Sequence, residues 1–241
     1  TRPAVGDGLV AFSVSEAAQG GVDLDGDGSA TGDVLHVFER ASGASVNTRL
    51  PVTSPLFLGD GSVSHLALET SRGTVIIEVI RDWGPRGADR FFNLARLGYY
   101  DENRFFRVNP GRWTQFGVNG DPAIAKAWRT RTFPDDPFKT SNTRGTLAFA
   151  FAVPNGRTTQ VFFNLGDNRP THDPPSKDVF VPFGRVITGM DIVDSFNAEY
   201  REGPGGIRAG KQDPFFDGGN AWLLREFPRL DYIKKVGVIK H

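Results

Sequence analysis

Residues 73–108 read GTVIIEVIRDWGPRGADRFFNLARLGYYDENRFFRV and carry three successive structural signals. The run TVIIEVI is rich in β-branched residues and predicts a strand. Residues 84–98 repeat apolar side chains at helical spacing, with a proline in the first turn and a glycine at the end, so they predict a helix. Residues 103–108, NRFFRV, predict a further strand. The stretch therefore predicts a strand, a helix and a strand in that order.

The same alternation of short strands continues on both sides of this stretch. Residues 63–80 predict two strands around a polar Ser-Arg-Gly turn, and residues 188–199 predict a second helix. Residues 201–220 mix Gly, Pro and charged residues and predict a long irregular loop. Further strands are predicted at WTQFGV, RGTLAFAF, TQVFFNLG, VPFGRVI and RLDYIKKVGVIK. Many strands with two helices indicate a mainly β fold and a β-barrel rather than alternating βα units.

The first 62 residues differ from the rest in composition. LVAFSVS at 9–15 and DVLHVFE at 33–39 alternate apolar and other side chains as half-buried strands do. Residues 51–62 are rich in Pro, Gly and Ser, which predicts a linker. We therefore expect residues 1–62 to form a small β extension and residues 63–241 to form the main domain. So short a segment cannot bury much core alone, so we expect it to dock on the main domain or on a β-sheet partner.

Composition limits the classes of function. The 241 residues include 28 Lys and Arg against 28 Asp and Glu, for a net charge of +0. This balance argues against a broad surface for nucleic acid or an anionic membrane. No apolar run reaches the ~20 residues that span a bilayer. The chain has 0 cysteines, which rules out disulfides and thiolate catalysis and slightly favours an extracytoplasmic bacterial compartment.

The common catalytic motifs are missing from the sequence. The histidines at 36, 65, 172 and 241 are scattered, without the spacing of a zinc motif. The chain contains neither the G-x-S-x-G motif nor the phosphate-binding G-x-x-x-x-G-K motif. Asp135 and Asp136 in FPDDPF are more typical of a solvated turn than of a glycosidase pair. Hydrolase and phosphotransferase functions are therefore disfavoured.

Arg107 is the most unusual residue of the quoted stretch, because it follows two phenylalanines. One interpretation is a barrel-surface arginine whose stem packs on Phe105 or Phe106 while its guanidinium reaches water. The other is a cation held in a dry site as a hydrogen-bond donor. The residues around it leave both interpretations open.

The quoted stretch resembles the opening of the cyclophilins, the peptidyl-prolyl cis-trans isomerases. The resemblance continues through PGRWTQFGVNGDP, SNTRGTLAFAFAVPNGRTTQVFFNLGDN, FVPFGRVITGMDIVD and GNAWLLREFPRLDYIKK, covering about residues 63–241. It is strongest to the bacterial-type branch, in which QFG…GDP and PFG are usual. The resemblance implies a closed antiparallel β-barrel of about eight strands capped by two helices. It also implies a protein that binds proline-containing peptides or unfolded chains and speeds rotation about Xaa-Pro bonds.

The resemblance also implies roles for individual residues. Rotation crosses a barrier of ~18–20 kcal/mol that comes from amide resonance. Because no bond is made and no proton is transferred, no cofactor is required. Arg107 would be the catalytic donor to the twisted amide. The implied substrate-binding residues are Phe162 as the floor of the proline pocket, Gln115 and Gln160 beside Arg107, and Ala150 and Phe151 along the peptide.

Three departures from the cyclophilin pattern bear on substrate preference. Arg112 and Trp113 stand where many cyclophilins have Phe-Met, and Phe180 stands where a histidine is common. Trp113 and Phe180 can supply apolar walls to the substrate site, whereas Arg112 must point elsewhere or shape preference. The tryptophan that binds cyclosporin in many relatives has no equivalent in RPTHDPPSKD.

An acidic loop, DLDGDGSATGDV, lies in the N-terminal extension. Asp23, Asp25 and Asp27 occupy alternate positions before Gly28, as in loops that bind calcium. The bidentate Glu expected at the twelfth position is absent, and Asp-Gly-Asp-Gly also suits a hairpin turn. A structural calcium ion and a plain turn both remain open. A second class of function also remains open, namely a proline-peptide-binding or assembly module that docks through this extension.

Overall fold

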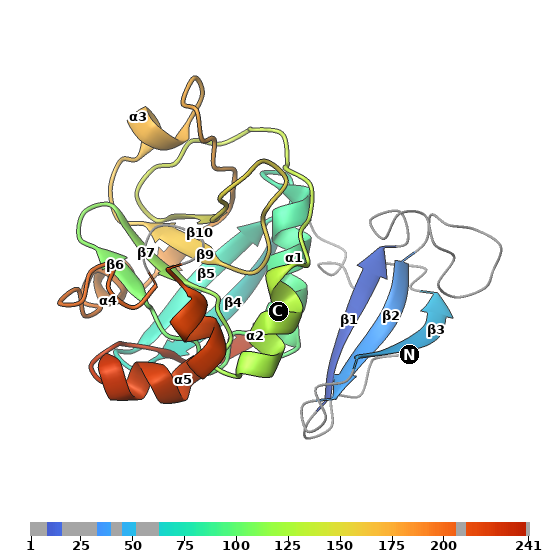
Figure 1. The fold of residues 1–241 in the computed structure, drawn as a ribbon. Helices are drawn as coiled ribbons and strands as arrows, with labels where there is room; N and C mark the ends of the chain where they lie inside the picture. The colour runs from blue at the N-terminus through green and yellow to red at the C-terminus, as the bar shows by residue number, and fades with distance from the viewer. Residues whose placement is uncertain (1–8, 16–32, 40–44, 52–62, 206–210, 240–241) are drawn as a thin grey trace. The chain divides into compact units, whose positions relative to one another are not determined.

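The computed structural model describes residues 9–15, 33–39, 45–51, 63–205 and 211–239 (Figure 1). The chain divides into two compact units, Thr1–Phe57 and Leu58–His241. The first contains an antiparallel sheet in the order β1-β2-β3. Its strands are β1 (Leu9–Ser15), β2 (Asp33–Glu39) and β3 (Ser45–Pro51). The two strands expected from the alternating patterns at 9–15 and 33–39 are confirmed.

The second unit is built on an eight-stranded antiparallel sheet in the order β11-β4-β5-β10-β8-β9-β7-β6. Neighbours such as β4 and β5, or β6 and β7, are joined by short turns, whereas β10 lies between β5 and β8. The strands are β4 (Val63–Thr70), β5 (Thr74–Ile80), β6 (Arg107–Asn109), β7 (Trp113–Phe116), β8 (Thr146–Phe149), β9 (Val161–Asn164), β10 (Pro182–Thr188) and β11 (Ile233–Val238).

The two outer strands of this sheet come together just before they begin. Arg104 and Tyr232 form an isolated antiparallel bridge. The Phe105 amide donates to the Asp231 carbonyl at 2.9 Å, and the Ile233 amide donates to the Asn103 carbonyl at 2.9 Å. The expected mainly β fold of about eight antiparallel strands is confirmed. The outer strands β6 and β11 are joined only by this short bridge among the described residues, whereas a fully closed barrel would have a continuous ladder of hydrogen bonds between them.

The described residues contain five helices, three more than the sequence predicts. α1 (Pro85–Arg96) confirms the best helix of the sequence and packs against β5, β10 and β11 (Figure 1). The second predicted helix is shorter than expected, because α4 covers only Met190–Asp194. The unpredicted helices are α2 (Pro122–Arg129), α3 (Arg169–His172) and α5 (Asp213–Glu226). No helix in the described ranges has the length and apolar character needed to cross a membrane.

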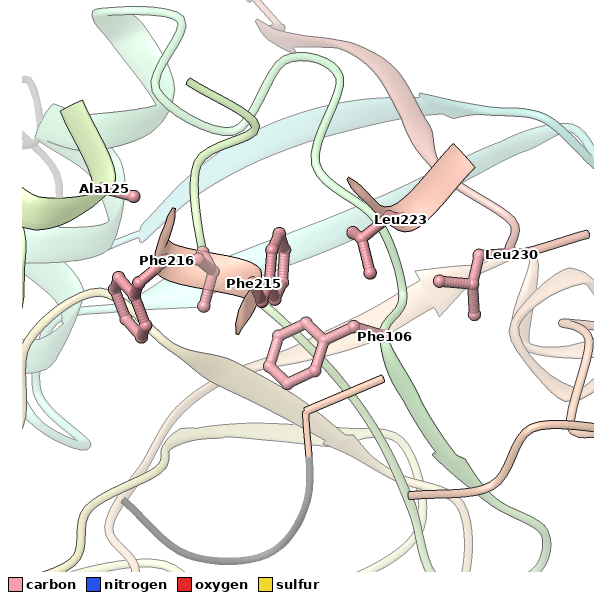
Figure 2. Close-up of a cluster of buried hydrophobic side chains, with 7 residues drawn as sticks. Phe106, Ala125, Phe215, Phe216, Leu223 and Leu230 are labelled. Carbon is pink, nitrogen blue, oxygen red and sulfur yellow. The ribbon is translucent and has the colours of Figure 1, made fainter. Parts of the chain in front are cut away.

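α5 corrects the prediction of an irregular loop over residues 201–220. Gly218 and Gly219 hide the helical pattern, and Gly219 indeed has non-helical dihedral angles at a kink. Tertiary packing compensates for these poor helix formers. Figure 2 shows the buried cluster that holds α5, in which Phe215 meets Phe106 edge to face at 5.4 Å between ring centroids. The cluster consists of Phe106, Val118, Ala125, Phe215, Phe216, Leu223 and Leu230.

Asp136 corrects the interpretation of FPDDPF as a solvated turn. Asp136 is only 9% exposed. Its carboxylate accepts hydrogen bonds from the amides of Arg86 at 3.1 Å and Gly87 at 2.9 Å. These amides belong to the first turn of α1, where backbone donors lack partners within the helix. The residue before that helix is Gly84, which has no side chain to cap it, so Asp136 caps α1 from a distant part of the chain.

Candidate functional site

One row across the sheet gathers the main residues singled out from the sequence. In the ladder, Arg107 on β6 lies opposite Gln115 on β7, and Gln115 lies opposite Phe162 on β9. Phe162 in turn lies opposite Ala148 on β8. Residues directly opposite each other on paired strands project from the same face. Side chains 55 positions apart in sequence, from Arg107 to Phe162, therefore share one face of the sheet.

The guanidinium of Arg107 is held on two sides. Its Nη1 donates to Gln115 Oε1 at 2.8 Å, and its Nε and Nη2 donate to Glu202 Oε1 at 3.1 and 2.8 Å. Its side chain is 11% exposed, and its Cζ lies 4.8 Å from the centroid of the Trp113 ring. A guanidinium in this setting does not reach into bulk water, as a snorkelling arginine would.

A chain of side-chain amides continues from Arg107. Gln115 Nε2 donates to Gln160 Oε1 at 2.8 Å, and Gln160 Nε2 donates to Gln212 Oε1 at 2.9 Å. Gln212 Nε2 donates back to Gln160 Oε1 at 3.2 Å. Since Arg107 can only donate, it fixes the orientation of Gln115, which then fixes Gln160. The hydrogen bonds therefore run in one direction from Arg107 through Gln115 to Gln160, and Gln160 and Gln212 bond each other reciprocally at the start of α5.

The network keeps N–H groups that a ligand can use. A guanidinium has five N–H groups and a primary amide has two. Among the described residues, Arg107 uses three N–H groups, and Gln115 and Gln160 use one each. Two guanidinium N–H groups and one N–H on each glutamine are left. These unused N–H groups suit the carbonyl groups of a peptide.

An aromatic cluster adjoins this network. The ring of Phe162, which is 4% exposed, meets Phe180 and His172 edge to face at 5.3 and 5.6 Å between centroids. Phe180 also contacts Phe151 at 4.7 Å, and His172 stacks on Trp113 at 5.8 Å. The aromatic residues expected at the substrate site therefore form one cluster, in which Phe162, Phe180 and Phe151 are in direct contact and His172 joins Trp113 to them.

The side chains of Arg112 and Trp113 lie against each other at the substrate site expected from the sequence. Trp113 is half-buried, and the guanidinium of Arg112 lies 4.8 Å from its ring centroid. Arg112 is exposed and forms no ion pair with any other residue described. Trp113 thus supplies an apolar wall, and Arg112 adds a positive charge to the rim of the aromatic cluster.

Ala150 and Phe151 lie just past the end of β8. This strand lies inside the sheet, between β10 and β9, and the Ala150 amide donates to the Gln160 carbonyl at 2.9 Å. Their part in peptide binding stays a prediction. Asp23, Asp25 and Asp27 lie outside the described residues, so the calcium site also stays a prediction. Within the described residues, no group of three or more potential ligand side chains could hold a metal ion.

Three residues of this site were not predicted from the sequence, namely His172, Glu202 and Gln212. His172 carries no recognisable spacing, and only the fold brings it between Trp113 and Phe162. Glu202 and Gln212 belong to the stretch that the sequence predicts as an irregular loop. A glutamate in that loop gave no signal, because its partner Arg107 lies 95 positions earlier.

The sequence of this chain matches a known protein family. The family model described as cyclophilin type peptidyl-prolyl cis-trans isomerase matches residues 65–211. A peptidyl-prolyl cis-trans isomerase of Acinetobacter baylyi is 31% identical over 53% of this chain and 68% of its own length. Peptidyl-prolyl cis-trans isomerase A of Dickeya dadantii is 28% identical over 67% of this chain and 86% of its own length.

A solved structure agrees with the fold. A cyclophilin type peptidyl-prolyl cis-trans isomerase from Cryptosporidium parvum, solved in the presence of the dipeptide Ala-Pro, superimposes with a TM-score of 0.52. The match covers 73% of this chain and 99% of that chain at 17% sequence identity. At this level of identity the likeness concerns the arrangement of strands and helices.

Proposed function

Since the chain belongs to the cyclophilin-type peptidyl-prolyl cis-trans isomerase family and is an isomerase of Xaa-Pro bonds, we propose that Arg107 is its catalytic donor. In this proposal the guanidinium donates to the twisted prolyl amide while the proline ring packs on Phe162. The observation that carries the proposal is the guanidinium of Arg107, which Gln115 and Glu202 fix with N–H groups left over, on a side chain that is 11% exposed.

The chemistry requires little beyond this donor. Rotation about the bond loses amide resonance, and the prolyl nitrogen becomes pyramidal with a localised lone pair. A guanidinium is always charged and stabilises that lone pair without transferring a proton. The interaction is stronger in a preorganised site of low dielectric constant than in water. We therefore propose that catalysis needs no cofactor.

The aromatic cluster supports the place proposed for the proline ring. Phe162 shares a face with Arg107 and Gln115 and is walled by Phe180 and His172. Apolar rings can remove the pyrrolidine ring from water, which contributes about 25 cal/mol for each Å² buried. Gln115 and Gln160 would bond carbonyl groups of the same peptide, since each keeps one N–H. Ala150 and Phe151 would lie along the peptide beside them.

Exchange NMR of a short Xaa-Pro peptide tests this function. Without enzyme the isomers interconvert in ~10–100 s, too slowly for exchange cross-peaks. With a catalytic amount of the intact chain, cross-peaks between cis and trans signals are expected. Titration with the peptide is also expected to shift the indole N–H signal of Trp113 and the side-chain amide signals of Gln115 and Gln160. Exchange that stays at the rate of the free peptide, with a folded protein present, would refute the proposal for that substrate.

His172 predicts a dependence of stability on pH. Burial lowers the pKa of His172, and the nearby charges of Arg112 and Arg107 act in the same direction, against Thr171 and Asp173. The unfolded chain then takes up a proton at about pH 6.5, while the folded chain resists it. The stability contributed by neutral His172 is complete above that pH and is lost as the pH falls through the lowered pKa.

The variant His172→Phe measures this contribution, because it keeps an aromatic ring that cannot titrate. Free energies of unfolding in urea are compared on both sides of the ordinary histidine pKa of about 6.5. Wild type is expected to lose more stability than His172→Phe on acidification. Equal losses in the two proteins would show that the histidine is not the group responsible.

A role for residues 1–62 in docking to a β-sheet partner stays a prediction. The antiparallel sheet β1-β2-β3 has two outer strands, β1 and β3, and an unpaired strand edge can add a further strand. Such docking would complement the isomerase activity.

A further inference from the structure

Glu202 occupies one edge of the Arg107 guanidinium. Its Oε1 atom accepts from both Nε, at 3.1 Å, and Nη2, at 2.8 Å. The Glu202 side chain is 28% exposed, whereas that of Arg107 is 11% exposed. The carboxylate therefore bonds a nearly buried cation from the solvent side.

The backbone that carries Glu202 is fixed to the same strand as Arg107. The amide of Val108, the residue after Arg107, donates to the Arg201 carbonyl at 3.1 Å. The Gly203 amide donates to the Tyr200 carbonyl at 2.8 Å, which closes a tight turn around Glu202. Gly205 lies so near Phe106 that an added Cβ would approach its ring to 2.4 Å. Two attachments, at Arg201 and Gly205, together with this turn hold the carboxylate in register with β6.

This arrangement determines which donors of Arg107 are left for a substrate. Glu202 takes one N–H on Nε and one on Nη2, and Gln115 takes one on Nη1. The remaining two N–H groups are one on each terminal nitrogen. With two acceptors on two different edges, the planar guanidinium cannot turn about its long stem without breaking charge-assisted hydrogen bonds.

We propose that Glu202 is a positioning residue for catalysis, which holds the Nε–Nη2 edge of Arg107 so that its other N–H groups point at the prolyl amide. This rests on the proposed role of Arg107 as the catalytic donor. The carboxylate also compensates the charge of a cation that is almost removed from water, since a buried charge without a partner is strongly unfavourable.

Removing the Glu202 carboxylate is expected to lower the isomerisation rate of the bound peptide and to leave the affinity for the peptide almost unchanged. Misplacing a reacting group by about 1 Å can cost ~10²-fold in rate. We therefore expect Glu202→Ala to lower the isomerisation rate of bound peptide by about 10–100-fold, with the dissociation constant changed by less than about threefold. Glu202→Gln keeps an oxygen acceptor at the same place and is expected to recover most of the rate.

Glu199→Ala is the matched control. Glu199 lies on the same segment and forms an ion pair with Arg229, whose side chain is 64% exposed. This change also removes one carboxylate and one arginine contact, but outside the site, so catalysis is expected to stay at the wild-type level. NMR line shapes recorded over a range of peptide concentrations give the bound-state rate and the dissociation constant separately.

A variant could also lose rate because residues 200–205 detach from β6. Hydrogen exchange of the Val108 amide detects this, because that amide bonds the Arg201 carbonyl. If Glu202→Ala slows catalysis while this amide stays protected, the lost ion pair is responsible. If the amide loses protection in Glu202→Ala and in Glu202→Gln alike, Glu202 only docks the segment and the inference is overturned. A bound-state rate unchanged in Glu202→Ala would overturn it too.

Arg107→Ala separates this inference from the function on which it rests. In the Arg107→Ala background, adding Glu202→Ala is expected to cause no further loss of rate, because the group that it positions is gone. If Arg107→Ala abolishes catalysis and Glu202→Ala does not slow it, only the inference fails. If Arg107→Ala leaves catalysis intact, the proposed role of Arg107 fails, and the role of Glu202 fails with it.

Discussion

Arg107→Ala is expected to lower kcat/KM for Xaa-Pro isomerisation by about 10²–10³-fold, the range found when a preorganised donor is removed from an active site. Alanine removes the N–H groups that would meet the prolyl nitrogen. It also removes the guanidinium that donates to Gln115 Oε1 and to the Glu202 carboxylate, so both acceptors lose this partner. The loss is expected in kcat more than in KM, because the interaction strengthens as the amide twists.

Exchange NMR of the same Xaa-Pro peptide, together with thermal unfolding, measures this effect. Arg107→Lys is the informative companion, because lysine keeps the charge but lacks the planar fork that meets Gln115 and Glu202 together. It is expected to recover only a small part of the rate. An Arg107→Ala protein that folds and keeps its rate within about threefold of wild type would rule out Arg107 as the catalytic donor.

Gly117→Ala is expected to destabilise the protein by about 3 kcal/mol. Gly117 follows β7 with a φ of +108°, a region that side chains with a Cβ rarely adopt. An added Cβ would also stand 2.3 Å from the Thr159 carbonyl oxygen and 2.7 Å from the Gln160 Cα. Both neighbours are backbone atoms, so relief requires a shift of the chain that carries Gln160. We therefore expect lower activity together with a melting temperature lowered by roughly 6–12 °C.

Gly111→Ala is the control for backbone strain alone. Gly111 has a φ of +73°, but no atom lies within 4 Å of an added Cβ. The left-handed conformation costs about 1–2 kcal/mol for an alanine, so this variant should be clearly more stable than Gly117→Ala. Both variants are compared by urea and thermal unfolding. Equal destabilisation would mean that the contact with Thr159 and Gln160 is relieved without cost.

Local sequence pattern predicted much of the fold. The β-branched run at 74–80 and the helix signals around Pro85 and Gly98 were confirmed as β5 and α1. The sequence also predicted about eight antiparallel strands, since each short strand has its own apolar content and its own turn. These elements could be predicted because their signals depend on residues close together in the chain.

Helices with weak local signals escaped prediction. α5 contains Gly218 and Gly219 and a kink, and its stability comes from packing Phe215 and Leu223 into a buried cluster with Phe106. Gly-Asp-Pro before α2 is typical of a turn, but Asp121 caps a helix by accepting from the Ala123 amide at 2.9 Å. A turn signal and a helix N-terminus use the same residues, and only the following tertiary contacts distinguish them.

The sequence by itself determined the strand pattern, the main helix and, through its resemblance to the cyclophilins, the family and the residues Arg107, Gln115 and Phe162. Only the tertiary structure decided what surrounds them. It brought Glu202 to Arg107, Gln212 to Gln160 and His172 to Phe162. A lone Glu, Gln or His carries no periodicity, so its partner is set by the long-range register of strands and by loop docking, which no local pattern encodes.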